Sequence, residues 1–238
     1  MSVRSAGETA EGLWANWWRM GGVAGILFLA LFIVGIIVEG DLPAFDEPVE
    51  KAQAWLTDNG QQYLAGDYLI GLAFVLFFLP FLSSLRGVLA SAEGGAAVWS
   101  RVAFTGGLLF LIMGATASVF LGALAFSFGV VEEGDEATIR TLQYLDFYAF
   151  TGAFLALTPF FLASSLVIWQ TGVLWRWLAL LGIPVAVLAA ISSAAYFESD
   201  PEGTLAGIGF IAGPLAGIWV LLVSVAMILK REPPAAAA

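Results

Sequence analysis

Residues 21–38 read GGVAGILFLALFIVGIIV, an apolar run without a single charged side chain. A helix that crosses the hydrocarbon core of a bilayer needs about 20 such residues. Hydrocarbon offers no partner to backbone N–H and C=O groups, so a spanning segment must satisfy them within its own helix. The stretch therefore predicts a transmembrane helix.

Five further stretches have the same character. The six predicted spans are Gly21 to Val38, Tyr63 to Leu82, Val102 to Phe128, Phe147 to Trp169, Trp177 to Phe197 and Leu205 to Leu229. We predict an all-α integral membrane bundle of six transmembrane helices over residues 21–230. A cytoplasmic interfacial segment at 1–20 precedes it, and a disordered cytoplasmic tail at 231–238 follows it.

The composition suits lipid as the solvent and excludes several kinds of chemistry. Hydrophobic residues make up 60% of the chain, and charged residues make up 12%. Neither cysteine nor histidine occurs, which removes disulfides, thiol nucleophiles, histidine-ligated haem, most zinc sites and Ser-His-Asp triads. We predict no metal site and no cofactor. The net charge of −10 argues against nucleic acid as a partner, because phosphate binding needs clustered lysine and arginine.

Two segments outside the predicted spans have amphipathic patterns. In the N-terminal one, an apolar face predicts a short helix on the cytoplasmic membrane surface. This face consists of Leu13, Trp14, Trp17 and Trp18. Between the first two spans, Asp46 can cap an outer helix that Gly60 ends. The apolar stripe of the outer helix consists of Val49, Ala52, Trp55 and Leu56. Either segment anchors to the membrane surface or docks a partner.

Two predicted spans share an ordered set of residues, which indicates an internal repeat. Asp67 precedes Pro80, and Asp146 precedes Pro159, by thirteen residues in each case. A tryptophan and an arginine also stand before the first, third and fifth spans. We predict three helical hairpins in the same topology, the third of them diverged. Convergent composition is the alternative explanation.

Small residues four apart mark two of the spans for close helix packing. The stripes are Gly114, Ser118 and Gly122 on the third span, and Gly209, Gly213 and Gly217 on the sixth. We expect these two spans to be central and to pack against each other. The alternative is that the stripes are dimerisation faces in a homo-oligomer.

Asp67 and Asp146 are the strongest candidates for a functional site, because charge is costly in a spanning segment. In the functional interpretation they line an outer vestibule with a third acidic residue and several tyrosines. These additional residues are Tyr63, Tyr68, Tyr148, Tyr196 and Glu198. In the alternative interpretation, each aspartate only caps the N-terminus of its own helix.

The first span opens with Trp18-Arg19-Met20-Gly21-Gly22-Val23-Ala24-Gly25-Ile26, and an acidic outer helix and five further spans follow. In this arrangement the chain resembles a family of uncharacterised multi-pass prokaryotic membrane proteins, known only as a domain of unknown function. The resemblance implies the cytoplasmic (inner) membrane of a prokaryote. It implies no particular activity.

These observations favour a non-enzymatic protein embedded in the lipid bilayer. We expect it to bind a small hydrophobic or cationic ligand, or a membrane partner, through the outer mouth of the bundle. A small transporter or channel is the first alternative, and it needs a continuous polar path through the spans. A membrane-embedded enzyme that uses the paired aspartates is the second.

The distribution of basic residues predicts the orientation. One side of the predicted membrane carries Arg4, Arg19, Arg86, Arg101, Arg176, Lys230 and Arg231, and the other carries Lys51 and Arg140. Because lysine and arginine in short loops are retained in the cytoplasm, both termini should be cytoplasmic and residues 41–59 should lie outside. Accessibility labelling of tags at these three places measures this. A C-terminal tag that is reached from outside the cell would contradict it.

Overall fold

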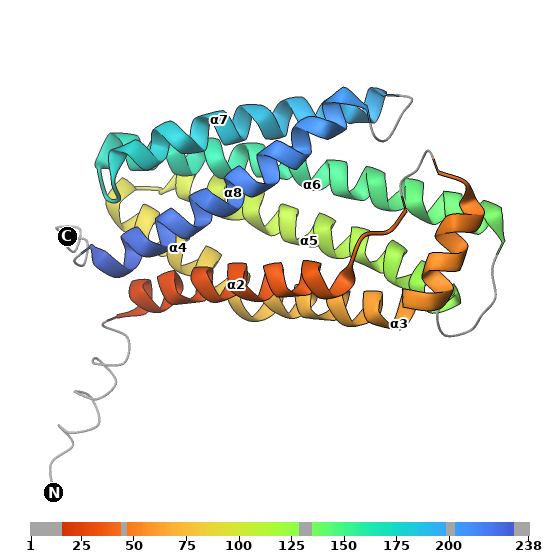
Figure 1. Ribbon diagram of the computed structural model, residues 1–238. Helices are drawn as coiled ribbons and strands as arrows, with labels where there is room; N and C mark the ends of the chain where they lie inside the picture. Colours follow the sequence, from red (N-terminus) through yellow and green to blue (C-terminus); the bar gives the residue numbers. More distant parts are fainter. Residues whose placement is uncertain (1–15, 44–46, 129–134, 199–202, 231–238) are drawn as a thin grey trace, which may run out of the picture.

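The computed structural model describes residues 16–43, 47–128, 135–198 and 203–230 (Figure 1). Its elements are α2 (Trp17–Glu39), α3 (Val49–Ala73), η1 (Phe74–Phe78), α4 (Leu79–Glu93), α5 (Val98–Phe126), α6 (Glu136–Thr171), α7 (Arg176–Ser193), η3 (Ala194–Phe197) and α8 (Thr204–Leu229). Within these residues, 6 helices are long and apolar enough to span a membrane. The chain is therefore an all-α, multi-pass membrane protein, and the predicted fold class is confirmed.

The spans form a closed ring. Each packs against the span before it, and α8 returns to pack against α2. Successive spans run in opposite directions, so the segments that connect them lie alternately at the two ends of the bundle. Most charged residues are in or next to these segments, and those of opposite sign gather mainly at opposite ends. We call one end the basic end, with Arg19, Arg86, Arg101, Arg176 and Lys230, and the other the acidic end, with Glu39, Asp41, Glu47, Glu50, Asp58, Asp135, Glu136 and Glu198.

Glycines set the spacing between neighbouring helices. A Cβ atom at Gly22 of α2 would lie 2.5 Å from the carbonyl oxygen of Ser224 in α8. A Cβ atom at Gly106 of α5 would lie 2.7 Å from the backbone nitrogen of Phe160 in α6. Helices in lipid gain little from burying apolar surface against one another, so such close backbone approach contributes much of their attraction.

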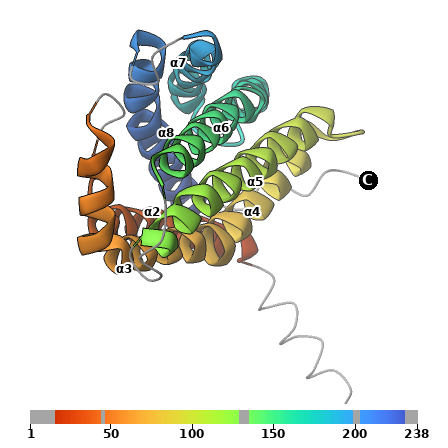
Figure 2. The same cartoon turned by 90° about the vertical axis from the view of Figure 1, so that its right-hand side faces the viewer.

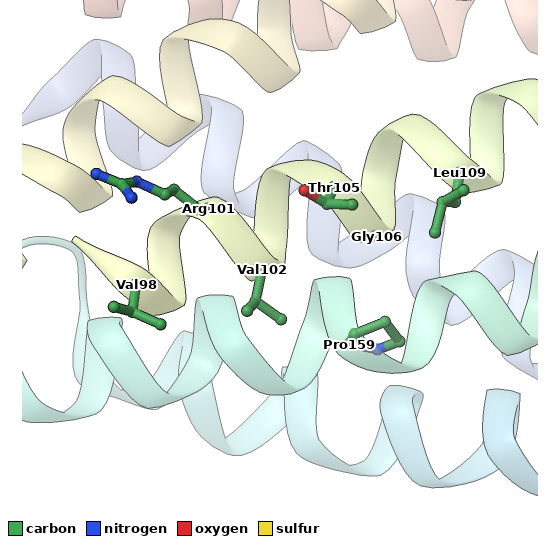
Figure 3. Close-up of a pocket in the computed structure, with 7 residues that line it drawn as sticks. All are labelled: Val98, Arg101, Val102, Thr105, Gly106, Leu109 and Pro159. Carbon is green, nitrogen blue, oxygen red and sulfur yellow. The ribbon is translucent and has the colours of Figure 1, made fainter. Parts of the chain in front are cut away.

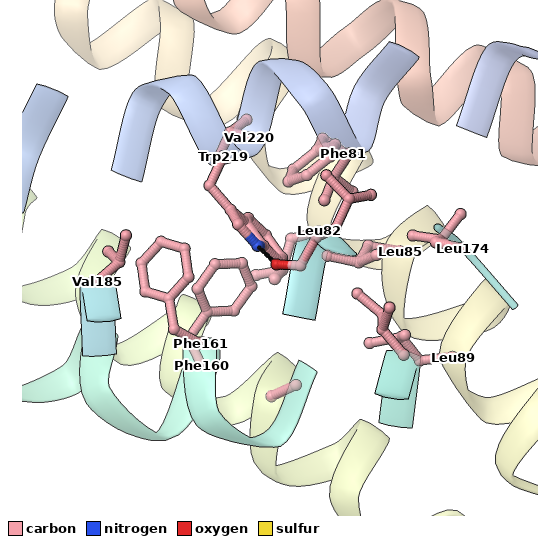
Figure 4. Close-up of a cluster of buried hydrophobic side chains, with 14 of the residues drawn as sticks. Phe81, Leu82, Leu85, Leu89, Phe160, Phe161, Leu174, Val185, Trp219 and Val220 are labelled. Carbon is pink, nitrogen blue, oxygen red and sulfur yellow. Dashed lines mark hydrogen bonds between the residues drawn. The ribbon is translucent and has the colours of Figure 1, made fainter. Parts of the chain in front are cut away.

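Two hydrophobic cores fill the bundle. In the main core, the indole of Trp219 packs edge-on against Phe161 with ring centroids 4.9 Å apart, and its Nε1 donates a hydrogen bond to the Leu178 carbonyl at 2.9 Å (Figure 4). A smaller core at the acidic end joins the first part of α3 to α5 and α6. It contains Val49, Ala52, Leu56, Tyr63, Leu124, Ala125, Phe128 and Ile139.

The expectation that the third and sixth spans pack together at the centre is wrong. Within the described residues, α5 packs mainly against α3, α4 and α6, whereas α8 packs mainly against α2 and α7. In the most apolar stretch of each helix, 72% of residues are buried for α6 but only 39% for α8 and 17% for α5. The most buried span is therefore α6. A row of small residues shows that close packing is feasible but not which neighbouring helix it meets.

The small residues of the two stripes have different surroundings. A Cβ atom at Gly209 would meet Ser192 and Phe154, and one at Gly217 would meet only Leu29. One at Gly114 or Gly213 would meet nothing within 4 Å. Contact of these last two glycines with a second copy of the chain stays a prediction.

The two amphipathic segments also differ from expectation. Trp17 and Trp18 belong to the first turn of α2, where Trp18 is buried against the bundle instead of lying on the membrane surface. The outer helix does not end at Gly60, because α3 continues through it into the second span. Figures 1 and 2 show that the first part of α3 instead runs at a steep angle to the rest of the bundle. Leu13, Trp14, Asp46 and the tail at 231–238 lie outside the described residues.

The two prolines of the predicted repeat have different local structures. The second span widens into the π-helical segment η1 immediately before Pro80. A proline ring clashes with the carbonyl four residues earlier, and a wider turn relieves that clash. Helix α6 passes Pro159 as an α-helix. Duplication of the hairpins stays a prediction.

We expect Gly22→Ala to lower the free energy of unfolding by about 1–3 kcal/mol, because its methyl group meets a backbone carbonyl that cannot rotate away. The matched control is Gly213→Ala, which adds the same group where nothing lies within 4 Å. It should be neutral or stabilise by about 0.5–1 kcal/mol, since alanine favours a helix interior over glycine. Denaturant titration in detergent measures both. Equal effects at the two positions would show that the α2–α8 contact does not determine stability.

Candidate functional site

Three acidic side chains from three helices converge at the acidic end. Glu39 is the last residue of α2, Asp67 lies in α3 and Asp146 lies in α6. Asp146 is within electrostatic range of both Glu39 and Asp67, and Glu39 is within range of Asp67. All three side chains are partly buried. We call Glu39, Asp67 and Asp146 the carboxylate cluster.

Asp67 is held by the third span. The hydroxyl of Ser118 in α5 donates a hydrogen bond to its Oδ1 atom. One turn further along α5, Gly122 leaves room for the second carboxylate oxygen, since a Cβ atom there would lie 3.4 Å from Oδ2. Ser118 and Gly122, expected as packing residues, therefore border the carboxylate cluster.

Glu39 is held by the second span. Its carboxylate is hydrogen-bonded to the hydroxyl of Tyr63, a residue that is only 4% exposed. One turn earlier on α2, Gly35 lies against Ile70 and the Gly66 carbonyl, and the side-chain amide of Gln62 donates to the Val38 carbonyl at 2.9 Å. These contacts fix the end of α2 against α3.

The smaller core covers one side of the carboxylate cluster. The ring of Trp55 packs edge-on against Tyr63 at 6.1 Å, and a Cβ atom at Gly40 would lie 3.5 Å from Trp55 Cζ2. Arg140 Nη2 donates to the Glu47 carbonyl at 2.9 Å, which ties the segment before α3 to α6. Two aromatic rings therefore lie beside the carboxylates.

The helix-capping interpretation of the two aspartates is wrong. Helix α3 begins at Val49 and α6 begins at Glu136, so Asp67 and Asp146 both lie well inside helices whose N–H groups are already bonded. The residue that caps α6 is Asp135, which accepts a hydrogen bond from the Thr138 N–H at 2.7 Å. Hydrogen bonds from Thr138 hold the pKa of Asp135 below its usual value.

Within the described residues, the other predicted site residues form no hydrogen bond or ring contact with the carboxylate cluster. Tyr68 is 66% exposed. Tyr148 stacks on Tyr196 with ring centroids 5.6 Å apart, and the Tyr196 hydroxyl donates to the Tyr148 carbonyl at 2.9 Å. Glu198 accepts hydrogen bonds from the N–H groups of Leu205 and Ala206, and it therefore caps α8.

Sequence reasoning missed Glu39 as a site residue and Ser118 as a hydrogen-bond donor to the site. One signal for Glu39 was present: a carboxylate at the C-terminus of a helix opposes the helix dipole, so it needs another reason to be there. Nothing in the sequence pairs Ser118 with Asp67, because 51 positions separate them.

No basic residue that the structure describes forms an ion pair with the carboxylate cluster. In the described parts of the chain, Glu39, Asp67 and Asp146 form no ion pair; the pair that is formed there joins Lys51 to Glu47 at 2.6 Å. The same residues contain no group of three or more His, Cys, Asp or Glu side chains placed to hold a metal ion. The cluster is thus a partly buried set of like charges to which the described residues supply no counterion.

Comparisons of the chain with family models, with curated proteins and with solved structures find no match.

We expect Ser118→Ala to lower the free energy of unfolding by about 1–3 kcal/mol, because Asp67 loses a hydrogen-bond donor in a partly buried position. Thr116→Ala is the matched control on the same helix. The Thr116 hydroxyl is exposed and donates to the Ile112 carbonyl, so its loss should change stability by less than about 0.5 kcal/mol. Thermal unfolding in detergent compares the two variants, and a Ser118→Ala variant as stable as Thr116→Ala would contradict the role of Ser118.

Proposed function

We propose that this membrane protein binds a small organic cation of the ammonium class at the carboxylate cluster. The observation that carries the proposal is the convergence of Glu39, Asp67 and Asp146 from three helices without a basic partner among the described residues. Ionisable groups inside spanning segments are costly, and they persist where function requires them.

Electrostatics supports a cationic ligand. Like charges that are partly removed from water repel more strongly than exposed ones, because the medium around them screens less. A bound cation converts this repulsion into attraction. The surrounding charge has the same sign, since the chain carries a net charge of −10 and most of the described acidic residues outside the carboxylate cluster are also at this end. That field raises the local concentration of cations.

The neighbouring aromatic rings support an ammonium rather than a bare ion. Trp55 and Tyr63 lie beside Glu39, and the faces of such rings attract organic cations. A carboxylate and an aromatic face together suit a ligand with one charge and a small apolar body. A purely hydrophobic ligand would leave the carboxylates without a counterion.

The packing of the main core supports binding rather than conduction. Phe160, Phe161 and Trp219 fill the middle of the bundle with ring centroids 4.9–5.7 Å apart. A transporter or channel would need a polar path through this region. The described residues provide no feature that favours membrane-embedded catalysis over binding.

The proposed setting is the inner membrane of a prokaryote, with both termini in the cytoplasm. The resemblance of the sequence to uncharacterised prokaryotic membrane proteins and the basic residues at one end support it. In this orientation the carboxylate cluster faces the outside of the cell, so the ligand arrives from there.

The test is stabilisation of the purified protein by tetramethylammonium and methylammonium chloride, with sodium chloride at equal ionic strength as the reference. A ligand at about 100 times its Kd should stabilise the parent protein by about 2.7 kcal/mol. The double variant Asp67→Asn/Asp146→Asn should lose this stabilisation, because amides keep the shape but not the charge.

The matched control is Asp41→Asn/Asp58→Asn, which removes two exposed charges from the same end. It should keep the stabilisation by both ammonium salts. No stabilisation of the parent protein would contradict the proposal. Equal losses in the two double variants would contradict it as well, since they would indicate a general surface field instead of a site.

A further inference from the structure

A second feature lies at the opposite end of the molecule. An open groove of about 320 Å³ runs between α5 and α6, lined mainly by apolar side chains such as Val102, Leu109 and Pro159 (Figure 3). The floor of the groove is formed at Gly106, where the two helix backbones approach closely. The groove opens on the outside of the ring of helices, where lipid surrounds the protein.

One cation lines this groove. Arg101 is exposed, and its guanidinium group points back toward the start of α5 (Figure 3). It forms no ion pair with any residue that the structure describes. The acidic residue nearest in sequence, Glu93, is already occupied, because it accepts hydrogen bonds from the N–H groups of Trp99 and Ser100 at 2.9 and 2.8 Å.

The groove extends from the level of the lipid headgroups into the hydrocarbon layer. Trp99 and Trp169 are about half exposed at this end of α5 and α6, and exposed tryptophans prefer the membrane interface. Arg101 therefore lies at headgroup depth. Leu109 lies eight residues further along the helix, which is about 12 Å deeper at the α-helical rise.

We propose that the groove binds an anionic phospholipid, with its phosphate on Arg101 and one acyl chain along α5 and α6. Charge complementarity decides the occupant. A guanidinium group matches a phosphate with two parallel hydrogen bonds, and the apolar walls below it match a hydrocarbon chain. A soluble anion would leave those walls unoccupied, and a neutral apolar molecule would leave Arg101 without a partner.

The experiment uses a label in the groove. The chain contains no cysteine, so Leu109→Cys introduces a single site for an environment-sensitive fluorophore. Phosphatidylglycerol with brominated acyl chains quenches the label when a chain occupies the groove, and brominated phosphatidylcholine is the zwitterionic reference. One arginine near the membrane surface contributes about a five-fold preference for anionic lipid, and we expect that preference in the labelled protein.

Arg101→Gln should bring quenching by the two lipids to equality, whereas Arg101→Lys, which keeps the charge, should retain most of the preference. The matched control is Arg176→Gln, an exposed arginine at the same end that does not line the groove, and it should leave the preference unchanged. Equal quenching by both lipids in the labelled parent would overturn the proposal. An unchanged preference in Arg101→Gln, or an equal loss in Arg176→Gln, would overturn it as well.

Discussion

A backbone N–H or C=O group finds no hydrogen-bond partner in hydrocarbon, and the architecture of this protein follows from that constraint. Each apolar stretch satisfies its own backbone as a helix, so only side chains remain to decide how the helices assemble. At Gly22 and Gly106 the missing side chain lets one backbone reach the next. The most buried span, α6, contributes Phe160 and Phe161 to the main core, where both rings pack against Trp219 of α8.

At the acidic end, the helices are joined by polar contacts as well as by apolar packing. Polar contacts join different helices there, from Ser118 to Asp67 and from Tyr63 to Glu39, and they hold α2, α3 and α5 in one arrangement. Asp146 adds α6 to the group. Bringing three carboxylates together opposes folding, so the arrangement makes physical sense when a cation offsets their repulsion.

Other charged residues have partners that explain them without a ligand. Glu93 and Glu198 precede α5 and α8 and accept hydrogen bonds from the first free N–H groups of these helices. At the basic end, Lys230 donates to the Gly172 and Val173 carbonyls, and partial burial lowers its pKa. Acidic residues that cap helices thus differ from the carboxylate cluster, in which Asp67 and Glu39 are hydrogen-bonded to side chains of neighbouring helices. The tertiary structure is needed to see this difference, because it shows which group each carboxylate is hydrogen-bonded to.

The sequence alone determined the number of spans, because apolar runs mark them. It also determined the separation of charge, because the segments between the runs fall alternately at the two ends and carry mainly basic or mainly acidic residues. It also singled out Asp67 and Asp146, since a charge in an apolar run stands out. Only the tertiary structure decided that Glu39 and Ser118 join them, and that α6 rather than α5 or α8 is the most buried span. The physical reason is that lipid and the bundle interior are equally apolar, so the sequence of a spanning helix does not show which of its faces meets protein.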